Sequence, residues 1–235
     1  MKIIEKKTHK IVFSAEINRS LSNAIRRYTL QIPVVAIDEV EIVKNDSPLY
    51  DETLAHRLGL VPLKAGKKVE GKMNLSSNKE GLVYSGELKG DAEVIYDKIP
   101  LTLLGKGQEV EFKVTLTTGT GSQHSKFSPG LMFYREINEI ILDKDLLDGT
   151  IKNLPEIKIT EKGSKAIILD DGEKEVTSLF EEMAEEKNKH IEINPTNKVL
   201  INLETFGQLS VEDIFKKSID TLKKDLNEIS KKISK

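Results

Sequence analysis

Hydrophobic and polar positions along the chain predict two amphipathic helices, one near each end, with a strand-rich middle between them. Residues 18–33 change from a strand period to a helical one, with a cap from Asn18 or Ser20 and an end at Pro33. The apolar positions of this first helix fall at i, i+3, i+4 and i+7: Leu21, Ala24, Ile25 and Tyr28. This spacing places them on one face of the helix.

The second helix covers residues 210–235 and carries a longer apolar stripe. Ser210 is its expected N-cap, with Asp213 as the capping-box partner. The stripe consists of Val211, Ile214, Phe215, Ile219, Leu222, Leu226, Ile229 and Ile233. At about 1.5 Å per residue, this stripe is roughly 35 Å long. Because a small domain cannot cover that length, we expect part of the stripe to contact another chain.

Strand patterns occupy much of the remaining chain. Residues 2–17 and 34–43 read as strands, and residues 72–116 are strand-like with glycine turns. The clearest alternation is in "GQEVEFKVTLTTGTG", residues 107–121. Between these strands, "NDSPLYDETLAHRLGLVPL" predicts a helix capped by Ser47, with Pro48 in its first turn and an end at Gly59.

The pattern is weaker over residues 143–197. "EVTSLFEEMAEEKNK" predicts a helix, Pro195 predicts a break, and residues 198–206 predict a strand. The residues expected to supply a small core here are Leu146, Leu147, Ile151, Ile157, Ile159, Ile167, Ile168, Leu169, Leu179, Phe180, Met183 and Ile191. The one-sided spacing of Val176, Leu179, Phe180 and Met183 favours a docked helix. A disordered linker is the alternative, because the segment is rich in acidic residues and lysine.

Composition narrows the classes of function. The 235 residues carry a net charge of −2, which disfavours extensive direct contact with nucleic acid. The absence of cysteine excludes thiolate nucleophiles and sulfur-ligated metals, so no cofactor is expected. The sequence shows neither a secretory signal nor a membrane-spanning run, and therefore favours a cytoplasmic protein.

The loop "GSQHSKFSPG", residues 121–130, most resembles an active site. His124 lies among Ser122, Ser125 and Ser128, so a stand-alone hydrolase built on this loop is an alternative function. However, the sequence contains no G-x-S-x-G elbow, and no metal-ligand partner lies beside His124. A structural role is therefore favoured for His124.

Other chemical candidates are weaker. His56 has no second histidine at i+4, which favours a packing or interface role. Asp38 and Glu39 point to opposite faces of a strand, and the glycines near residue 120 lack phosphate-loop spacing. With no catalytic constellation, the residues themselves indicate a scaffold or interaction protein.

Four segments, in order, resemble the archaeal D-type subunit of DNA-directed RNA polymerase, whose family includes the bacterial alpha N-terminal domain and the third-largest subunit of eukaryotic polymerase II. They are "SNAIRRYTLQIPVVAIDEVEI", "NDSPLYDETLAHRLGLVPL", "IPLTLLGKGQEVEFKVTLTTGTGSQHSKFSP" and "INLETFGQLSVEDIFKKSIDTLKKDL". The run D-E-x-L-A-H-R-L-G-L-x-P-L within the second segment is highly specific.

This resemblance implies an α+β fold in three parts. Residues 1–45 and 191–235 form a two-piece dimerisation domain, residues 46–140 form an inserted β-rich domain, and residues 141–190 occupy the place of a ferredoxin-like insertion. The implied function is that of a non-catalytic assembly subunit in transcription, which pairs with subunit L and seats the two large catalytic subunits. In relatives that insertion holds iron–sulfur clusters through cysteines; here it is expected to be a cluster-less remnant.

The resemblance also assigns roles to individual residues. The expected partner interface comprises Leu21, Ala24, Ile25, Tyr28, Ile214, Phe215, Leu222 and Leu226. Arg26 and Arg27 are expected to contact a large subunit, with solvated arginines as the equal alternative on sequence alone. His124, Lys126, Phe127 and Pro129 form a structural assembly loop. This loop departs from the family at Gln123, Ser125 and Phe127, where relatives have Glu, Ala and Trp.

Overall fold

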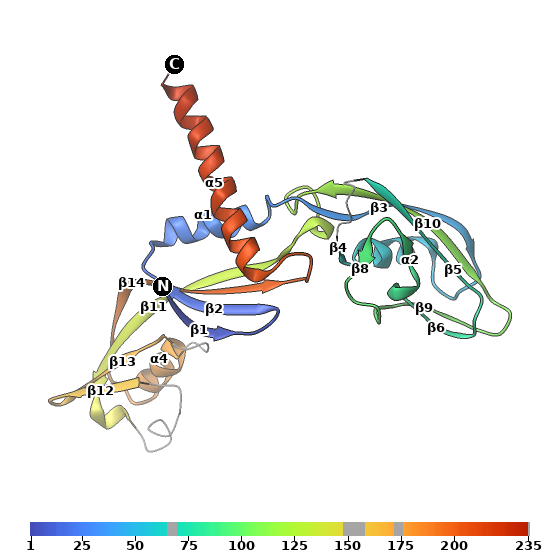
Figure 1. The fold of residues 1–235 in the computed structure, drawn as a ribbon. Helices are drawn as coiled ribbons and strands as arrows, with labels where there is room; N and C mark the ends of the chain where they lie inside the picture. Colours follow the sequence, from blue (N-terminus) through green and yellow to red (C-terminus); the bar gives the residue numbers. More distant parts are fainter. Residues whose placement is uncertain (65–69, 148–157, 172–175, 235) are drawn as a thin grey trace. The chain divides into compact units, whose positions relative to one another are not determined.

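The computed structural model describes residues 1–64, 70–147, 158–171 and 176–234, which form an α+β fold with antiparallel sheets (Figure 1). Two compact units are present. The first combines Met1–Ala24 with Met132–Leu203, and the second combines Ile25–Leu131 with Glu204–Lys235. Helix α1 (Arg19–Thr29) continues from the first unit into the second.

A six-stranded sheet runs through the first unit. Its order is β1 (Lys2–Lys6), β2 (Lys10–Ala15), β14 (Glu192–Thr205), β11 (Gly130–Asp143), β13 (Lys165–Leu169) and β12 (Lys158–Lys162). The prediction of one strand over residues 2–17 is wrong, because the backbone N–H of Lys7 bonds the carbonyl of Lys10 and closes a hairpin. The predicted break at Pro195 is also wrong, since β14 runs through it. The fixed φ of proline is compatible with extended backbone.

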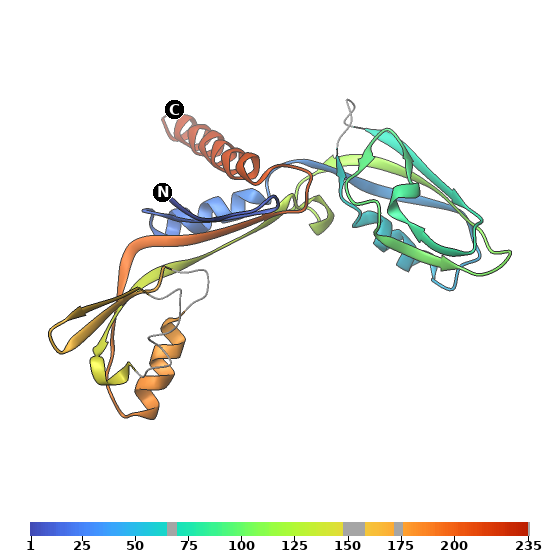
Figure 2. The ribbon, with the colours of Figure 1, turned by 60° about the horizontal axis from the view of Figure 1, so that its bottom comes forward.

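Helix α4 (Thr177–Glu186) packs onto one end of this sheet (Figure 2). Phe180 and Ala184 are buried against residues of β11, β13 and the following turn: Ile140, Leu142, Leu146, Leu147, Ala166 and Ile168. The docked helix is therefore confirmed. Leu179, an expected core residue, is instead exposed, and Ile151 and Ile157 lie outside the described residues.

A buried carboxylate holds the beginning of α4. Asp170 is 1% exposed, and its Oδ2 accepts a hydrogen bond of 2.7 Å from Thr177 Oγ1. Its Oδ1 accepts from Arg135 Nη2 at 3.1 Å and from the backbone N–H of Val176 at 3.3 Å. Because an unpaired buried carboxylate is costly, these donors are what allow Asp170 to be buried.

The second unit is built on a four-stranded sheet in the order β3 (Val34–Asn45), β10 (Val110–Gly119), β5 (Gly71–Ser77) and β7 (Lys89–Gly90). As predicted, alternate residues of β10 are buried: Val110, Phe112, Val114 and Leu116. They share a core with Leu54 and Leu58 of α2 (Asp51–Gly59). Arg57 ties α2 to β9 (Pro100–Leu104) by donating to the carbonyls of Pro100 and Leu101.

Shorter elements complete this unit. They are β4 (Leu63–Lys64) paired with β8 (Glu93–Val94), β6 (Gly81–Tyr84) paired with β9, and the 3-10 turns η1 (Ser85–Glu87) and η2 (Ser125–Phe127). A third turn, η3 (Lys144–Leu146), follows β11 in the first unit.

The start of α2 differs from the prediction. The helix begins at Asp51, after Tyr50, and Ser47 does not cap it. Instead, Asn45 Oδ1 accepts from both the backbone N–H and the hydroxyl of Ser47, which forms an Asx turn. The local side-chain hydrogen bonds compete successfully with helix initiation at Pro48.

Helix α5 (Val211–Ile233) follows the prediction closely. The Ser210 hydroxyl caps it by accepting from the backbone N–H of Asp213 at 3.1 Å. Asp213 does not complete a reciprocal capping box; its carboxylate accepts from the Ser210 hydroxyl at 2.8 Å.

No described helix is both long enough and apolar enough to span a membrane. The three-part domain division remains a prediction.

Candidate functional site

The assembly loop is held by its own backbone. His124 precedes η2, and its Nδ1 accepts a hydrogen bond of 3.2 Å from the backbone N–H of Lys126. An Nδ1 that accepts carries no proton, so the neutral imidazole bears its proton on Nε2. The ring is exposed. His124 therefore acts as the cap of a tight turn and presents an N–H at its outer edge.

Phe127 is the buried side chain that holds the assembly loop in place. It is buried, in a cluster with Val34, Ala36 and Leu209. Its ring lies against Gly119, where a Cβ would come within 2.6 Å of the ring atoms. Phe127, which stands where relatives have Trp, is thus a buried anchor of the loop.

Lys126 links the loop to β3. Its Nζ lies 2.7 Å from Asp38 Oδ1 and 5.1 Å from the centre of the Phe127 ring. Asp38 reaches this position because β3 bulges there: Glu39 pairs with Thr115 and Ile37 with Leu116, which leaves Asp38 without a partner across the ladder. The bulge turns a strand carboxylate toward a loop that is 88 residues away in sequence.

The end of the loop is tied to the strand that precedes α5. The carbonyl of Pro129 accepts a hydrogen bond of 3.0 Å from the backbone N–H of Phe206, and Pro129 itself is buried. Gln123, the residue that departs from the family's glutamate, accepts from the backbone N–H of Thr120 at 2.9 Å. A carboxylate could accept this same bond, so the change removes a charge without removing the contact.

No serine hydroxyl among the described residues donates to the His124 imidazole. Ser122 Oγ bonds instead to Gln31 Oε1 and Thr120 Oγ1, and the inner nitrogen of His124 is occupied by the Lys126 N–H. A catalytic serine and the histidine that acts as its general base need a direct hydrogen bond between their side chains. Nothing in the arrangement favours the hydrolase alternative.

The predicted interface residues occupy α1 and α5 as expected for two amphipathic helices. Ile25, Ile214 and Leu222 are buried, while Leu21 and Leu226 are exposed. Ala24, Tyr28 and Phe215 are half-buried, and Arg26 is half-buried beside an exposed Arg27. Whether these residues contact a partner stays a prediction.

One relationship on these helices is missed by sequence reasoning. Tyr28 Oη donates a hydrogen bond of 2.9 Å to Asp225 Oδ2. This hydrogen bond, with partial burial and the nearby negative charge, raises the pKa of Tyr28 above its ordinary value. Helical spacing assigns Tyr28 to the apolar face, and nothing in the local pattern singles out Asp225 as its partner.

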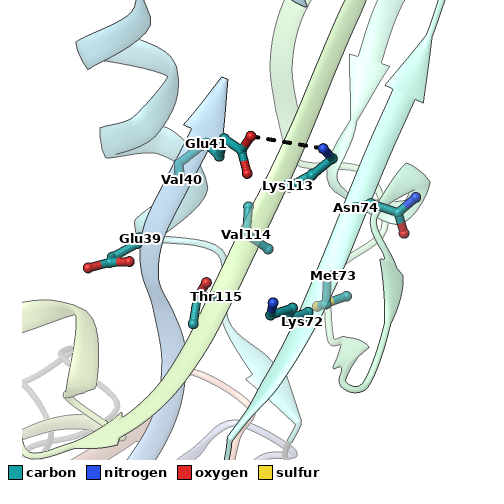
Figure 3. Close-up of a pocket in the computed structure, with 9 residues that line it drawn as sticks. All are labelled: Glu39, Val40, Glu41, Lys72, Met73, Asn74, Lys113, Val114 and Thr115. Atoms are coloured by element: carbon teal, nitrogen blue, oxygen red, sulfur yellow. Dashed lines mark ion pairs between the residues drawn. The ribbon is translucent and has the colours of Figure 1, made fainter. Parts of the chain in front are cut away.

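A hollow lies on the outward face of the β3–β10–β5 sheet (Figure 3). It measures about 780 Å³ and presents Glu39, Glu41, Lys113 and Lys72, with Lys113 Nζ 3.9 Å from Glu41 Oε1. These side chains alternate with the buried residues of the same strands. The hollow therefore has the composition of a solvated sheet face. Within the described residues, no group of three or more His, Cys, Asp or Glu is placed to hold a metal ion.

Comparisons with known proteins agree with the sequence resemblance. The family of the RNA polymerase Rpb3/Rpb11 dimerisation domain matches residues 13–226. The DNA-directed RNA polymerase subunit Rpo3 of Thermococcus kodakarensis is 33% identical over 233 residues, which cover 91% of this chain and 89% of the relative. Subunit Rpo3 of Pyrococcus horikoshii is 32% identical over 92% of this chain and 90% of its own length. Subunit Rpo3 of Methanocaldococcus jannaschii is 39% identical over a shorter match, 54% of this chain and 70% of the relative.

Proposed function

This chain belongs to the Rpb3/Rpb11 dimerisation-domain family of RNA polymerase subunits, and we propose that it is a non-catalytic assembly subunit of an archaeal-type DNA-directed RNA polymerase. It pairs with subunit L, and the pair is the platform for the two large catalytic subunits. Nucleotidyl transfer belongs to those large subunits. The near-balanced charge of the chain supports assembly rather than extensive contact with nucleic acid.

The observation that carries this proposal is the apolar stripe of α5. Val211, Ile214 and Leu222 of the stripe are buried, but the stripe continues with Leu226, Ile229 and Ile233, which are 55%, 53% and 80% exposed. Three large aliphatic side chains on one helix face favour burial against a partner. Tight pairing with L would remove them from water.

The domain division supports the same function. We propose that residues 1–45 and 191–235 form the dimerisation domain, residues 46–140 the inserted domain, and residues 141–190 the remnant of a ferredoxin-like insertion. A cluster in that remnant would need thiolate ligands, and the chain has no cysteine. Its core is instead hydrophobic, around Phe180 and Ile168.

Co-expression with an archaeal L subunit tests the proposal. We expect a one-to-one complex by size-exclusion chromatography with light scattering, and incorporation of that complex into polymerase when both large subunits are supplied. The D-type and L subunits of a close relative serve as the control pair. If this chain and L elute separately at concentrations where the control pair associates, the proposed function is wrong.

A further inference from the structure

Helix α5 packs onto its own chain through an inner face that stops before the helix does. Four residues of this inner face are buried: Val211, Ile214, Ser218 and Leu222. The next position of the same face is Asp225, whose carboxylate accepts the hydrogen bond from Tyr28. Every residue from Leu226 to Ile233 is exposed. About two turns of α5 therefore lack cover from the residues that the structure describes.

A second line of apolar residues has the spacing of a coiled-coil seam. Its members alternate at intervals of four and three residues: Phe215, Ile219, Leu222, Leu226, Ile229 and Ile233. We call this line the α5 seam. It shares Leu222 with the inner face and then diverges from it, so that Leu226 and Ile233 are 55% and 80% exposed. At about 1.5 Å per residue, the seam is roughly 27 Å long.

The spacing of the α5 seam favours one helix as its occupant. Two apolar positions in every seven keep a narrow line of side chains on one side of a helix, and each of them fits between four residues of a facing helix. A helix face that packs on a globular core is wider, with three or four apolar positions per two turns. From Leu226 to Ile233, every residue outside the seam is polar or charged. The exposed end of α5 is therefore suited to a helix rather than to a broader surface.

Lysines flank the α5 seam on one side. Lys216 and Lys223 are seven residues apart, and each directly follows a seam residue, Phe215 or Leu222. Both are exposed, and neither has an ion pair with any residue that the structure describes. We call Lys216 and Lys223 the lysine flank. Because charged residues beside a coiled-coil seam set the choice of partner helix, carboxylates on that helix would complement the lysine flank.

The opposite flank of the seam offers no unengaged carboxylate. Its positions, also seven residues apart, are Ser218, Asp225 and Lys232. Ser218 is buried, Lys232 is exposed, and Asp225 accepts the hydrogen bond from Tyr28. A second copy of α5 would thus bring lysines rather than unengaged carboxylates to the lysine flank.

We propose that the α5 seam pairs with a single helix of subunit L, and that this helix carries acidic residues against the lysine flank. Lys216 and Lys223 then select L over a second copy of this chain and over apolar helices without such charges. Charge complementarity at the edge of an interface contributes more to specificity than to affinity. The proposal rests on the proposed function and deepens it by naming the residues that choose the partner.

Charge reversal tests this selection. One double variant combines Lys216→Glu with Lys223→Glu, and its matched control combines Lys217→Glu with Lys224→Glu. Each control residue is exposed and lies one position further along, about 100° round the helix and away from the seam. The two proteins therefore have the same net charge and differ in which side of α5 has changed. Their affinity for L is measured by titration at low and at high salt.

At low salt, the flank variant should bind L about tenfold more weakly than the wild type, and the control should match the wild type. The difference should shrink at high salt, because dissolved ions screen exposed charges. Thermal unfolding of the isolated chains should be unchanged, since all four lysines are exposed.

Carbodiimide crosslinking tests the contact itself, because this reagent joins a lysine amine to a carboxylate only where the two groups touch. In the pair with L, we expect Lys223 to form an amide with an aspartate or glutamate on one L helix. Lys224, the adjacent control, should not react in this way.

The outcomes are distinguishable. If the wild-type chain does not pair with L, the proposed function is wrong. If it pairs with L but the flank variant binds as tightly as the control, or Lys223 crosslinks no carboxylate of L, the lysine flank does not select the partner. A homodimer that forms through Leu226 and Ile229 in preference to the pair with L would also overturn the proposal.

Discussion

Tyr28 of α1 and Asp225 of α5 are 197 residues apart in sequence, yet the phenol hydroxyl donates a 2.9 Å hydrogen bond to the carboxylate. Both side chains are half-buried. The bond joins the last turn of α1 to the middle of α5, close to the point where the apolar stripe becomes exposed at Leu226. A polar pair of this kind orients one helix on the other, which apolar contacts alone do less specifically.

The Tyr28 hydrogen bond should make stability depend on pH in the alkaline range. The pKa of Tyr28 is raised in the folded state. The hydrogen bond therefore contributes fully to the free energy of unfolding below the pKa of an unfolded tyrosine, about 10, and this contribution is lost as the pH rises through the folded-state pKa. Urea unfolding of wild type and Tyr28→Phe from pH 7 to 11 measures this contribution. We expect a difference at pH 7 that shrinks above about pH 10. A difference that stays constant to pH 11 would contradict the assigned bond.

Replacement of Leu226 by aspartate should abolish pairing with L. The side chain is 55% exposed, so the isolated chain should unfold like the wild type, while a charge on the stripe should cost several kcal/mol in the complex. Light scattering after co-expression measures the pairing. Leu103→Asp on β9, at 54% exposure, is the control and should pair normally. Retained tight pairing by Leu226→Asp would show that α5 is not the interface.

Arg27 and Arg26 should differ in their effect on assembly. Arg27 is exposed, whereas Arg26 is half-buried and has contacts within the chain. We expect Arg27→Ala to pair normally with L but to bind the large subunits more weakly, because guanidinium groups suit recognition of partner carboxylates. Binding of the L-paired variant to the large subunits measures this. If the Arg27→Ala chain pairs normally with L and also binds the large subunits normally, Arg27 is a solvated side chain.

Loss of the Asp170 carboxylate should destabilise the first unit. Asp170→Ala leaves Arg135 and Thr177 without their buried acceptor, so we expect a loss of about 3–5 kcal/mol in the free energy of unfolding. Asp145→Ala is the control in the same unit: its carboxylate is 81% exposed and lies 3.0 Å from Lys189 Nζ, so its loss should lower the free energy of unfolding far less. Equal effects of the two changes would show that the network does not hold α4.

Helix α4 should remain folded without any metal. Its amides from Phe180 to Glu186 should exchange slowly, and an iron chelator should change neither the exchange nor pairing with L. Phe180→Ala should speed exchange across the helix and cost about 3–5 kcal/mol, because Phe180 fills the centre of its cluster. Fast exchange throughout α4 in the wild type would contradict a docked helix.

Local patterns were sufficient where apolar positions recur with one regular period along an element. The sequence determined α1, α5 with its Ser210 cap, and the alternation of Phe112 and Val114 in β10, since each depends on neighbours a few residues away. It failed at the start of α2, where the Asn45–Ser47 turn competes with helix initiation, and at the turn after Lys6.

Only the tertiary structure decided which distant residues meet. The Lys126–Asp38 pair spans 88 residues and depends on a bulge in β3, and the Tyr28–Asp225 hydrogen bond joins α1 to α5 across 197 residues. Such contacts depend on strand register and on chain crossings, which hydrophobic period does not encode. The hydrophobic period by itself predicted an interaction protein with a long apolar helix face; the packing of distant segments decided which polar side chains meet.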